Sequence, residues 1–167
     1  HMVEVLDRYF RQTFRDDPDS PVVQVQPYYE LAEGVSAAAF MGRDDAAEGG
    51  ESGRRRLDVA GLDADGNVVV TGEAERLNHD SHEAIPADYD KMAACDPEEA
   101  IWVTLNRDAA HDVLAALNDP PDDEPRVTKQ YSRNTAPREF KLDADGATDI
   151  LTVRHLSGKL EQPDWRA

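Results

Sequence analysis

The hydrophobic and polar positions of this chain follow two different periods. Apolar residues spaced three or four apart predict helices, whereas alternation or a short continuous apolar run predicts a strand. The helical spacing occurs over 3–15, 28–40, 86–95 and 108–117, and the strand patterns over 22–26, 100–105, 126–131 and 139–142. Pro86 is expected as the first residue of its helix and Asp108 as a helix cap. The segment 148–160 fits either pattern; a helix with Thr148 or Asp149 as cap is favoured.

The stretch from Arg56 to Arg76 predicts a β-hairpin. Asp65-Gly66 is a strong signal for a two-residue turn between two short apolar strands. With this turn, position i of the first strand faces position 131 − i of the second, so Asp58 lies opposite Glu73. Side chains alternate along a strand, and Glu75 therefore shares the face of Glu73.

Like charges placed opposite one another destabilise a sheet unless something neutralises them. A divalent cation is one candidate, because carboxylate oxygens are the ligands that Mg²⁺ and Mn²⁺ prefer. The alternative is that Asp58, Glu73 and Glu75 form a solvated face in a chain that is acidic throughout. The neighbouring sequences LDVAGL and VVVTG are apolar or small, and this favours acids set into a buried pattern.

The order of the expected elements indicates an α/β fold. A strand that follows a helix at Ala100 requires a crossover connection and a mixed sheet. The polar run DPPDDEP over 119–125 is typical of a stiff linker. We therefore divide the chain into an N-terminal helix and lead-in (3–27), a core (28–118) and a C-terminal extension packed on the core (119–167).

Composition adds a formal net charge of −17, from 35 acidic and 18 basic residues. Acid-rich, lysine-poor composition with a normal share of apolar residues resembles proteins of salt-loving microbes, in which molar salt screens self-repulsion. The alternative is an acidic interaction tail, but the acids are scattered among well-patterned apolar segments. The one cysteine, Cys95, allows no internal disulfide, and no apolar run is long enough to span a membrane. A cytoplasmic protein without a membrane partner is expected.

Helix, then a hairpin bearing Asp on one strand and Glu-x-Glu on the next, then helix-strand-helix, resembles the PD-(D/E)xK nuclease superfamily. The resemblance covers about 90 residues, from Tyr28 to Asn118. It implies the restriction-endonuclease-like fold, a mixed sheet with flanking helices. It also implies hydrolysis of DNA phosphodiester bonds with Mg²⁺ or Mn²⁺ as cofactor.

The resemblance also implies roles for individual residues. Asp58 and Glu73 would hold the metal, and Glu33 on the helix before the hairpin would be a further ligand, with Glu30 as the alternative. The family places lysine two residues after the second acid, where this chain has Glu75. Some members carry that lysine on the following helix, and the resemblance then assigns the role to Lys91.

The basic residues near the hairpin are candidates for contacts with DNA phosphates. They are Arg54, Arg55, Arg56 and Arg76. A solvated loop that balances nearby acids explains the first three equally well. The leading expectation is a metal-dependent DNA nuclease, and the alternative is a catalytically inactive domain that binds DNA or assembles within a larger DNA-processing machine. A homodimer is a further expectation by analogy with nucleases of this fold.

Overall fold

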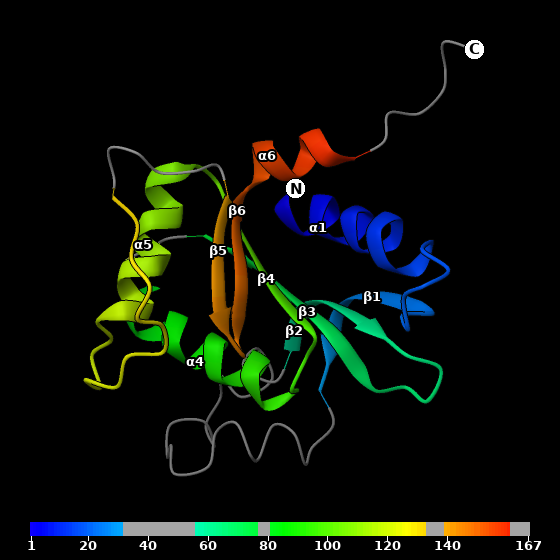
Figure 1. The fold of residues 1–167 in the computed structure, drawn as a ribbon, viewed down its shortest axis with the longest axis horizontal. Coiled ribbons are helices and arrows are strands. Elements are labelled where there is room, and N and C mark those ends of the chain that lie inside the picture. Colours follow the sequence, from blue (N-terminus) through cyan, green and yellow to red (C-terminus); the bar gives the residue numbers. More distant parts are fainter. Residues whose placement is uncertain (32–55, 77–80, 133–138, 161–167) are drawn as a thin grey trace.

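The computed structural model describes residues 1–31, 56–76, 81–132 and 139–160, and these form an α/β fold around one mixed sheet (Figure 1). The six strands lie in the order β1-β2-β3-β4-β6-β5. Their bounds are β1 Gln24–Glu30, β2 Arg56–Leu62, β3 Val68–Glu75, β4 Glu99–Thr104, β5 Glu139–Ala144 and β6 Ala147–Thr152. The helices are α1 Met2–Phe10, continued by a π-helical segment Arg11–Arg15, then α4 Ser81–Ala94, α5 Arg107–Asn118 and α6 Val153–Lys159.

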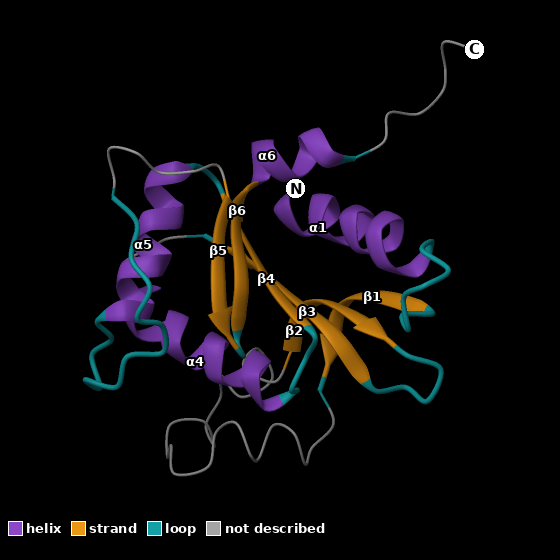
Figure 2. Cartoon of the chain, in the orientation of Figure 1, coloured by secondary structure: helices purple, strands orange, loops and turns teal. Residues whose placement is uncertain are grey.

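Helices cover both faces of the sheet (Figure 2). On one face, α4 and α5 enclose a core built around Trp102, Ile85 and Met92. On the other face, α1 and α6 enclose a second core that contains Phe10 and Leu156. The central strand β4 confirms the strand predicted over 100–105, and it contributes side chains to both cores.

The central part of the sheet is parallel. Strand β3 pairs in parallel with β4, and β4 pairs in parallel with β6. Helix α4 makes the crossover between β3 and β4, which confirms the predicted mixed sheet. Strands β5 and β6 extend this same sheet, and β1 runs across the expected boundary between residues 27 and 28.

The β2–β3 hairpin is confirmed, but the predicted two-residue turn is wrong. The backbone N–H of Asp63 donates to the carbonyl of Asn67 at 2.9 Å, so three residues form the loop. Leu62 consequently pairs with Val68, one position out of the predicted register. A bulge beside Leu62 cancels this offset, and from Gly61 opposite Val70 onward the strands follow the predicted register.

The turn requires a left-handed backbone conformation at Gly66, whose φ is +83°. Gly66→Ala is expected to lower the free energy of unfolding by about 1–2 kcal/mol, because a Cβ disfavours this left-handed conformation. No atom lies within 4 Å of a Cβ built on Gly66, so backbone conformation is the only cost among described residues. Urea unfolding measures the effect.

The matched control is Gly158→Ala in α6, where a Cβ also meets nothing within 4 Å. Alanine at this helical position is expected to stabilise by about 0.5–1 kcal/mol. Equal effects at the two positions would contradict the conformational argument.

Two predicted elements differ from the structure because of tertiary partners. Tyr28–Glu30 belong to β1 and not to a helix, since Tyr29 pairs with Leu57 of β2; the rest of the predicted helix lies outside the described residues. The segment 126–131 is not a strand. Its carbonyls at Val127 and Lys129 accept hydrogen bonds from the side chain of Asn118 instead of a neighbouring strand.

The helix predicted over 148–160 is wrong in its first part. Residues through Thr152 form β6, which gains pairing with β4 on one side and β5 on the other. The helix α6 then begins with Thr152 as its cap, whose hydroxyl accepts from the N–H of His155 at 3.2 Å. The hydrogen bonds to two neighbouring strands outweigh the local helical preference of these residues.

Two helix starts also differ from prediction. Helix α4 begins at Ser81, so Pro86 lies inside it rather than at its first position. Helix α5 is capped by Asn106 and not by Asp108: the Asn106 side chain accepts from the N–H of Ala109 at 2.8 Å. Among the described residues, no helix combines the length and apolar character needed to cross a membrane.

Candidate functional site

The structure brings together four of the residues that the sequence singles out. Asp58 lies on β2, Glu73 and Glu75 lie near the carboxyl end of β3, and Lys91 comes from α4, which packs on this face of the sheet. Glu73, Glu75 and Lys91 are buried, and Asp58 is half-buried. We call these four residues the carboxylate–lysine cluster.

Lys91 lies at the centre of the cluster. Its side chain is 2% exposed, and its Nζ lies 2.7 Å from Oε1 of Glu73 and 3.2 Å from Oδ1 of Asp88. It also donates a hydrogen bond to the backbone carbonyl of Arg56 at 2.8 Å. Burial by itself lowers the pKa of Lys91, but the charges of Glu73 and Asp88 outweigh this effect and hold the pKa above its ordinary value. The ammonium therefore stays protonated.

Asp58 and Glu73 lie next to each other across the hairpin. Backbone pairing of the two strands ends at Val59 and Gly72, and beyond it Oδ2 of Asp58 accepts from the N–H of Ala74 at 2.8 Å. The side chain of Asp58 thus replaces the next hydrogen bond of the ladder. A hydrogen bond between the Asp58 and Glu73 side chains adds to the effects on Glu73.

Both glutamates of β3 hold protons more tightly than usual. Burial raises the pKa of Glu73 well above its ordinary value, and the Lys91 charge offsets this only in part. Burial, followed by the charges of Asp88 and Asp58, raises the pKa of Glu75 to about 8. The cause is an excess of carboxylates over cations in a space with little water.

Asp88 also belongs to this site, although it is not among the candidate residues named from the sequence. It lies one turn before Lys91 on α4, and its charge raises the pKa of both Glu73 and Glu75. The signal available in the sequence was its i,i+3 spacing from Lys91. That spacing is too common on helices to single out a functional residue.

The donor set fits a hard divalent cation in its chemistry. Asp58, Glu73 and Glu75 offer carboxylate oxygens only, and the side chains of Glu73 and Glu75 are buried. In the geometry of the described part of the chain, no group of three or more His, Cys, Asp or Glu side chains is already arranged to hold a metal ion. Lys91 supplies the positive charge beside Glu73.

The other candidate residues contribute no side chain to the cluster or lie outside the described chain. Glu33, Arg54 and Arg55 fall outside the described residues. Arg56 is exposed, and its guanidinium lies 5.3 Å from the ring centre of Tyr28. Arg76 is exposed just after β3.

Glu30, the alternative metal ligand, lies at the end of β1, where it pairs with Arg56 on β2 and is exposed. The sequence predicted Glu30 on a helix over the site, whereas the structure places it on an edge strand. The pairing of β1 with β2 places it there.

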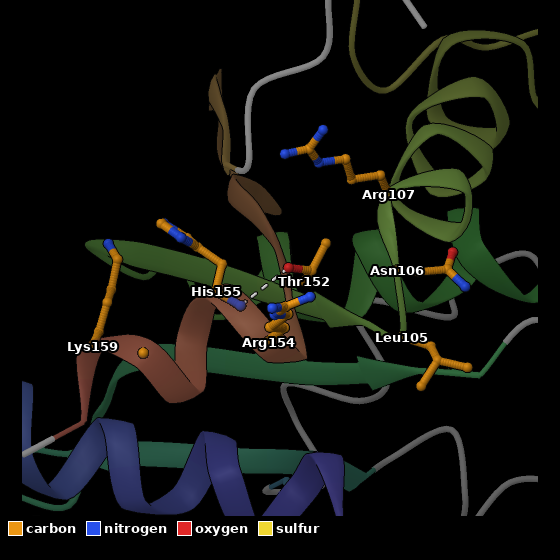
Figure 3. Close-up of a pocket in the computed structure, with 8 residues that line it drawn as sticks. Leu105, Asn106, Arg107, Thr152, Arg154, His155 and Lys159 are labelled. Atoms are coloured by element: carbon orange, nitrogen blue, oxygen red, sulfur yellow. Dashed lines mark hydrogen bonds between the residues drawn. The ribbon is translucent and has the colours of Figure 1, made fainter. Parts of the chain in front are cut away.

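A pocket at the ends of β4 and β6 has no counterpart in the sequence analysis (Figure 3). It is about 710 Å³ in volume, and Arg107, Arg154, His155 and Lys159 are among the residues that line it. Its residues come from the start of α5 and from the end of β6 and α6, more than 40 positions apart in the chain. The sequence shows no local cluster that would have revealed it.

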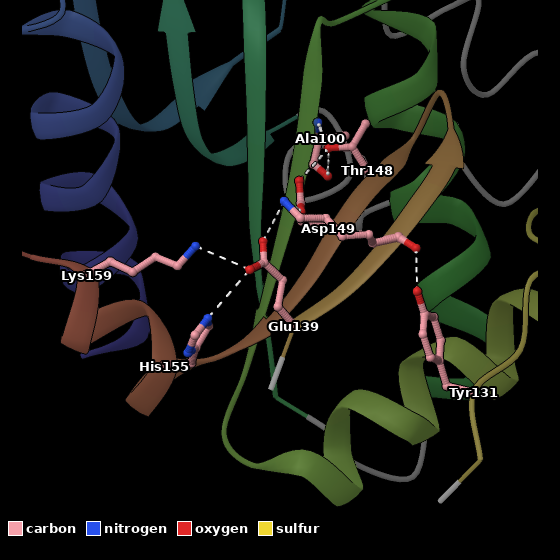
Figure 4. Close-up of polar contacts among 8 residues, drawn as sticks. Ala100, Tyr131, Glu139, Thr148, Asp149, His155 and Lys159 are labelled. Atoms are coloured by element: carbon pink, nitrogen blue, oxygen red, sulfur yellow. Dashed lines mark hydrogen bonds and ion pairs between the residues drawn. The ribbon is translucent and has the colours of Figure 1, made fainter. Parts of the chain in front are cut away.

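A second polar network lies beside this pocket (Figure 4). Glu139 is its centre: Lys141 lies 2.7 Å, Lys159 3.3 Å and His155 3.5 Å from its carboxylate. Burial alone would raise the pKa of Glu139, but hydrogen bonds from Lys141, Asp149 and Lys159 lower it to about 2. Lys141 also lies 2.7 Å from Asp149, so the network ties β5 to β6 and α6.

Comparison with known proteins adds no relative to this geometry. A scan of protein-family models, a search of curated proteins and a search of solved structures each found no match.

Proposed function

We propose that this chain is a metal-dependent nuclease domain that hydrolyses DNA phosphodiester bonds and has a restriction-endonuclease-like fold. The observation that carries the proposal is the position of Lys91. Its ammonium lies 2.7 Å from Glu73, inside the cluster where the resemblance requires a lysine that the hairpin itself does not supply.

The order of elements supports the fold part of this proposal. Helix α1 precedes the antiparallel strands β1, β2 and β3, and α4 then leads to β4, which is parallel to β3. Among the described residues, α1 is the helix that precedes these strands; most of the helix expected over 28–40 lies outside them. The cluster lies where the hairpin meets the crossover helix.

The residues of the cluster would divide the chemical work. Asp58 and Glu73 would hold Mg²⁺ or Mn²⁺, which when bound lowers the pKa of a water ligand and offsets charge on the phosphate. Lys91 cannot act as a base, because its raised pKa keeps it protonated. It would stabilise negative charge that develops on phosphate oxygens. Glu75, with a pKa of about 8, would accept a proton from the attacking water in its ionised form, so cleavage is expected to rise with pH up to about that value.

The test is cleavage of plasmid and oligonucleotide DNA with Mg²⁺ or Mn²⁺ over a range of KCl concentrations. Asp58→Asn and Glu73→Gln are expected to reduce the rate by on the order of a hundredfold or more, since each removes a charge that acts on the transition state. Circular dichroism and urea unfolding should show that both variants remain folded.

Asp65→Asn is the matched control. It makes the same carboxylate-to-amide change on the same hairpin, at an exposed turn position outside the cluster. Cleavage should stay within twofold of the wild-type rate. Cleavage at the wild-type rate by either Asp58→Asn or Glu73→Gln would contradict the site assignment.

One observation favours the alternative of a catalytically inactive DNA-binding or assembly domain. The Lys91 ammonium already contacts Glu73, Asp88 and the carbonyl of Arg56, which are as many acceptors as it has protons. In this case the cluster is a structural element under the hairpin. DNA binding by the wild-type protein without cleavage in any of the metals would support this alternative.

A further inference from the structure

We propose that the pocket between α5 and α6 binds the phosphate backbone of a nucleic-acid strand. We call it the basic pocket and define it by Asn106, Arg107, Thr152, Arg154, His155 and Lys159. The choice of nucleic acid as ligand rests on the proposed function, whereas the phosphate chemistry rests on the pocket itself.

The charge of the pocket opposes that of the chain. The chain carries a formal net charge of −17, yet two arginines, a lysine and a histidine line this one cavity. The arginine and lysine side chains present N–H donors, and guanidinium groups match phosphate oxygens in a two-point geometry. A phosphate group is the ligand chemistry that this lining fits.

Two of the cations are available for a ligand. His155 and Lys159 lie 3.5 and 3.3 Å from Glu139, which balances part of their charge. Arg107 and Arg154 are exposed and have no ion-pair partner among the described residues. Figure 3 shows that they come from different elements on either side of Thr152, Arg107 from α5 and Arg154 from α6.

The position of the pocket relates it to the carboxylate–lysine cluster. Glu75 pairs with Thr104 of β4, and Thr104 pairs with Thr152 of β6, so the three residues form one row across parallel strands. Neighbouring strands lie roughly 4.8 Å apart, which puts the backbones of Glu75 and Thr152 roughly 10 Å apart.

This separation corresponds to roughly three nucleotides at a rise of about 3.4 Å each. A strand whose scissile phosphate lies at the cluster could therefore place another of its phosphates at the basic pocket. A continuous polyanion, more than a free phosphate ion, fits two sites on one edge of the sheet.

The experiment measures DNA binding by fluorescence anisotropy, with labelled 16-nucleotide single-stranded and duplex DNA, in EDTA and over a KCl series. The double variant Arg107→Glu/Arg154→Glu is expected to bind at least tenfold more weakly than wild type. The slope of log affinity against log salt should fall by about 1–2, since each lost phosphate contact accounts for about 0.7–0.9.

The matched control is Arg8→Glu/Arg15→Glu, which makes the same change in net charge at two exposed arginines of α1 and the segment after it. Equal weakening by the two double variants would overturn the pocket assignment, and so would a lack of DNA binding by the wild type. Inorganic phosphate at matched ionic strength should not displace the DNA. Displacement would assign the pocket to free phosphate and overturn the strand proposal.

The outcome separates this inference from the proposed function. Asp65→Asn, at the exposed turn of the hairpin and outside both sites, should bind DNA as the wild type does. Pocket-dependent binding without cleavage in any metal would uphold the pocket and contradict the nuclease. Asp58-dependent cleavage, together with wild-type DNA affinity of the Arg107→Glu/Arg154→Glu variant, would uphold the nuclease and contradict the pocket.

Discussion

Replacing Lys91 with methionine is expected to lower the free energy of unfolding by about 3–5 kcal/mol at neutral to alkaline pH. Methionine preserves most of the side-chain volume but leaves the Glu73 carboxylate buried without the cation that lies 2.7 Å away in the wild type. The loss of stability thus comes from an uncompensated charge and not from a cavity. Urea unfolding at several pH values measures it.

The pH dependence has a definite sign. Glu73 has a folded-state pKa well above its ordinary value of 4.5, and Lys91 is the factor that lowers it. Without Lys91 the pKa rises further, so the folded state binds a proton that the unfolded state releases. The penalty should be smallest at low pH, where Glu73 is protonated in the folded state of both proteins, and should grow as the pH rises through the folded-state pKa of Glu73 in the wild type.

A double variant tests the mechanism. Lys91→Met/Glu73→Gln removes both charges, and it should recover most of the stability that Lys91→Met loses. The control is Lys129→Met, at an exposed lysine, which should change stability by less than about 0.5 kcal/mol. A Lys91→Met protein whose stability is unchanged at pH 8 would show that the buried ion pair contributes nothing.

Truncating Trp102 to alanine is expected to cost about 3–5 kcal/mol. Trp102 is fully buried in the centre of β4, and its indole N–H donates to the carbonyl of Gly146 at 2.8 Å. The substitution removes the largest fully buried side chain of the described residues and leaves that carbonyl without its partner. Thermal or urea unfolding measures the combined loss.

Trp102→Phe separates the two contributions. It keeps an aromatic ring in the core but cannot donate to Gly146, so a loss of about 1–3 kcal/mol is expected. Leu105→Ala is the control, since Leu105 follows directly after β4 and is 64% exposed. Should Trp102→Phe cost as much as Trp102→Ala, the hydrogen bond rather than the packing would dominate.

Gly146 shows why this region could not be predicted from the sequence. An Asp-Gly pair indicates a turn, and Asp145-Gly146 connects β5 to β6. A Cβ on Gly146 would overlap the backbone carbonyl of Tyr89, so this glycine is also required by close packing against α4. Nothing near Gly146 in the sequence indicates a contact with a residue 57 positions earlier.

The candidate site could also be predicted from the sequence only in part. The hairpin and the opposition of Asp58 and Glu73 could be predicted, because strand period and turn residues are local properties. The three-residue loop was missed, but a bulge beside Leu62 compensated for it. The contact between Lys91 and Glu73 depends on the packing of α4 on the sheet, and spacing along the chain could only suggest it.

The sequence by itself determined the elements whose patterns are local. These are the hairpin, the buried strand β4, the amphipathic helices α1 and α5, and the crossover that makes the sheet mixed. Only the tertiary structure decided that 28–30 and 147–152 are strands, that Lys91 is buried among carboxylates, and that Arg107 and Arg154 line one pocket. The physical reason is that strand pairing, desolvation and charge balance depend on residues that are close in space but distant in the chain.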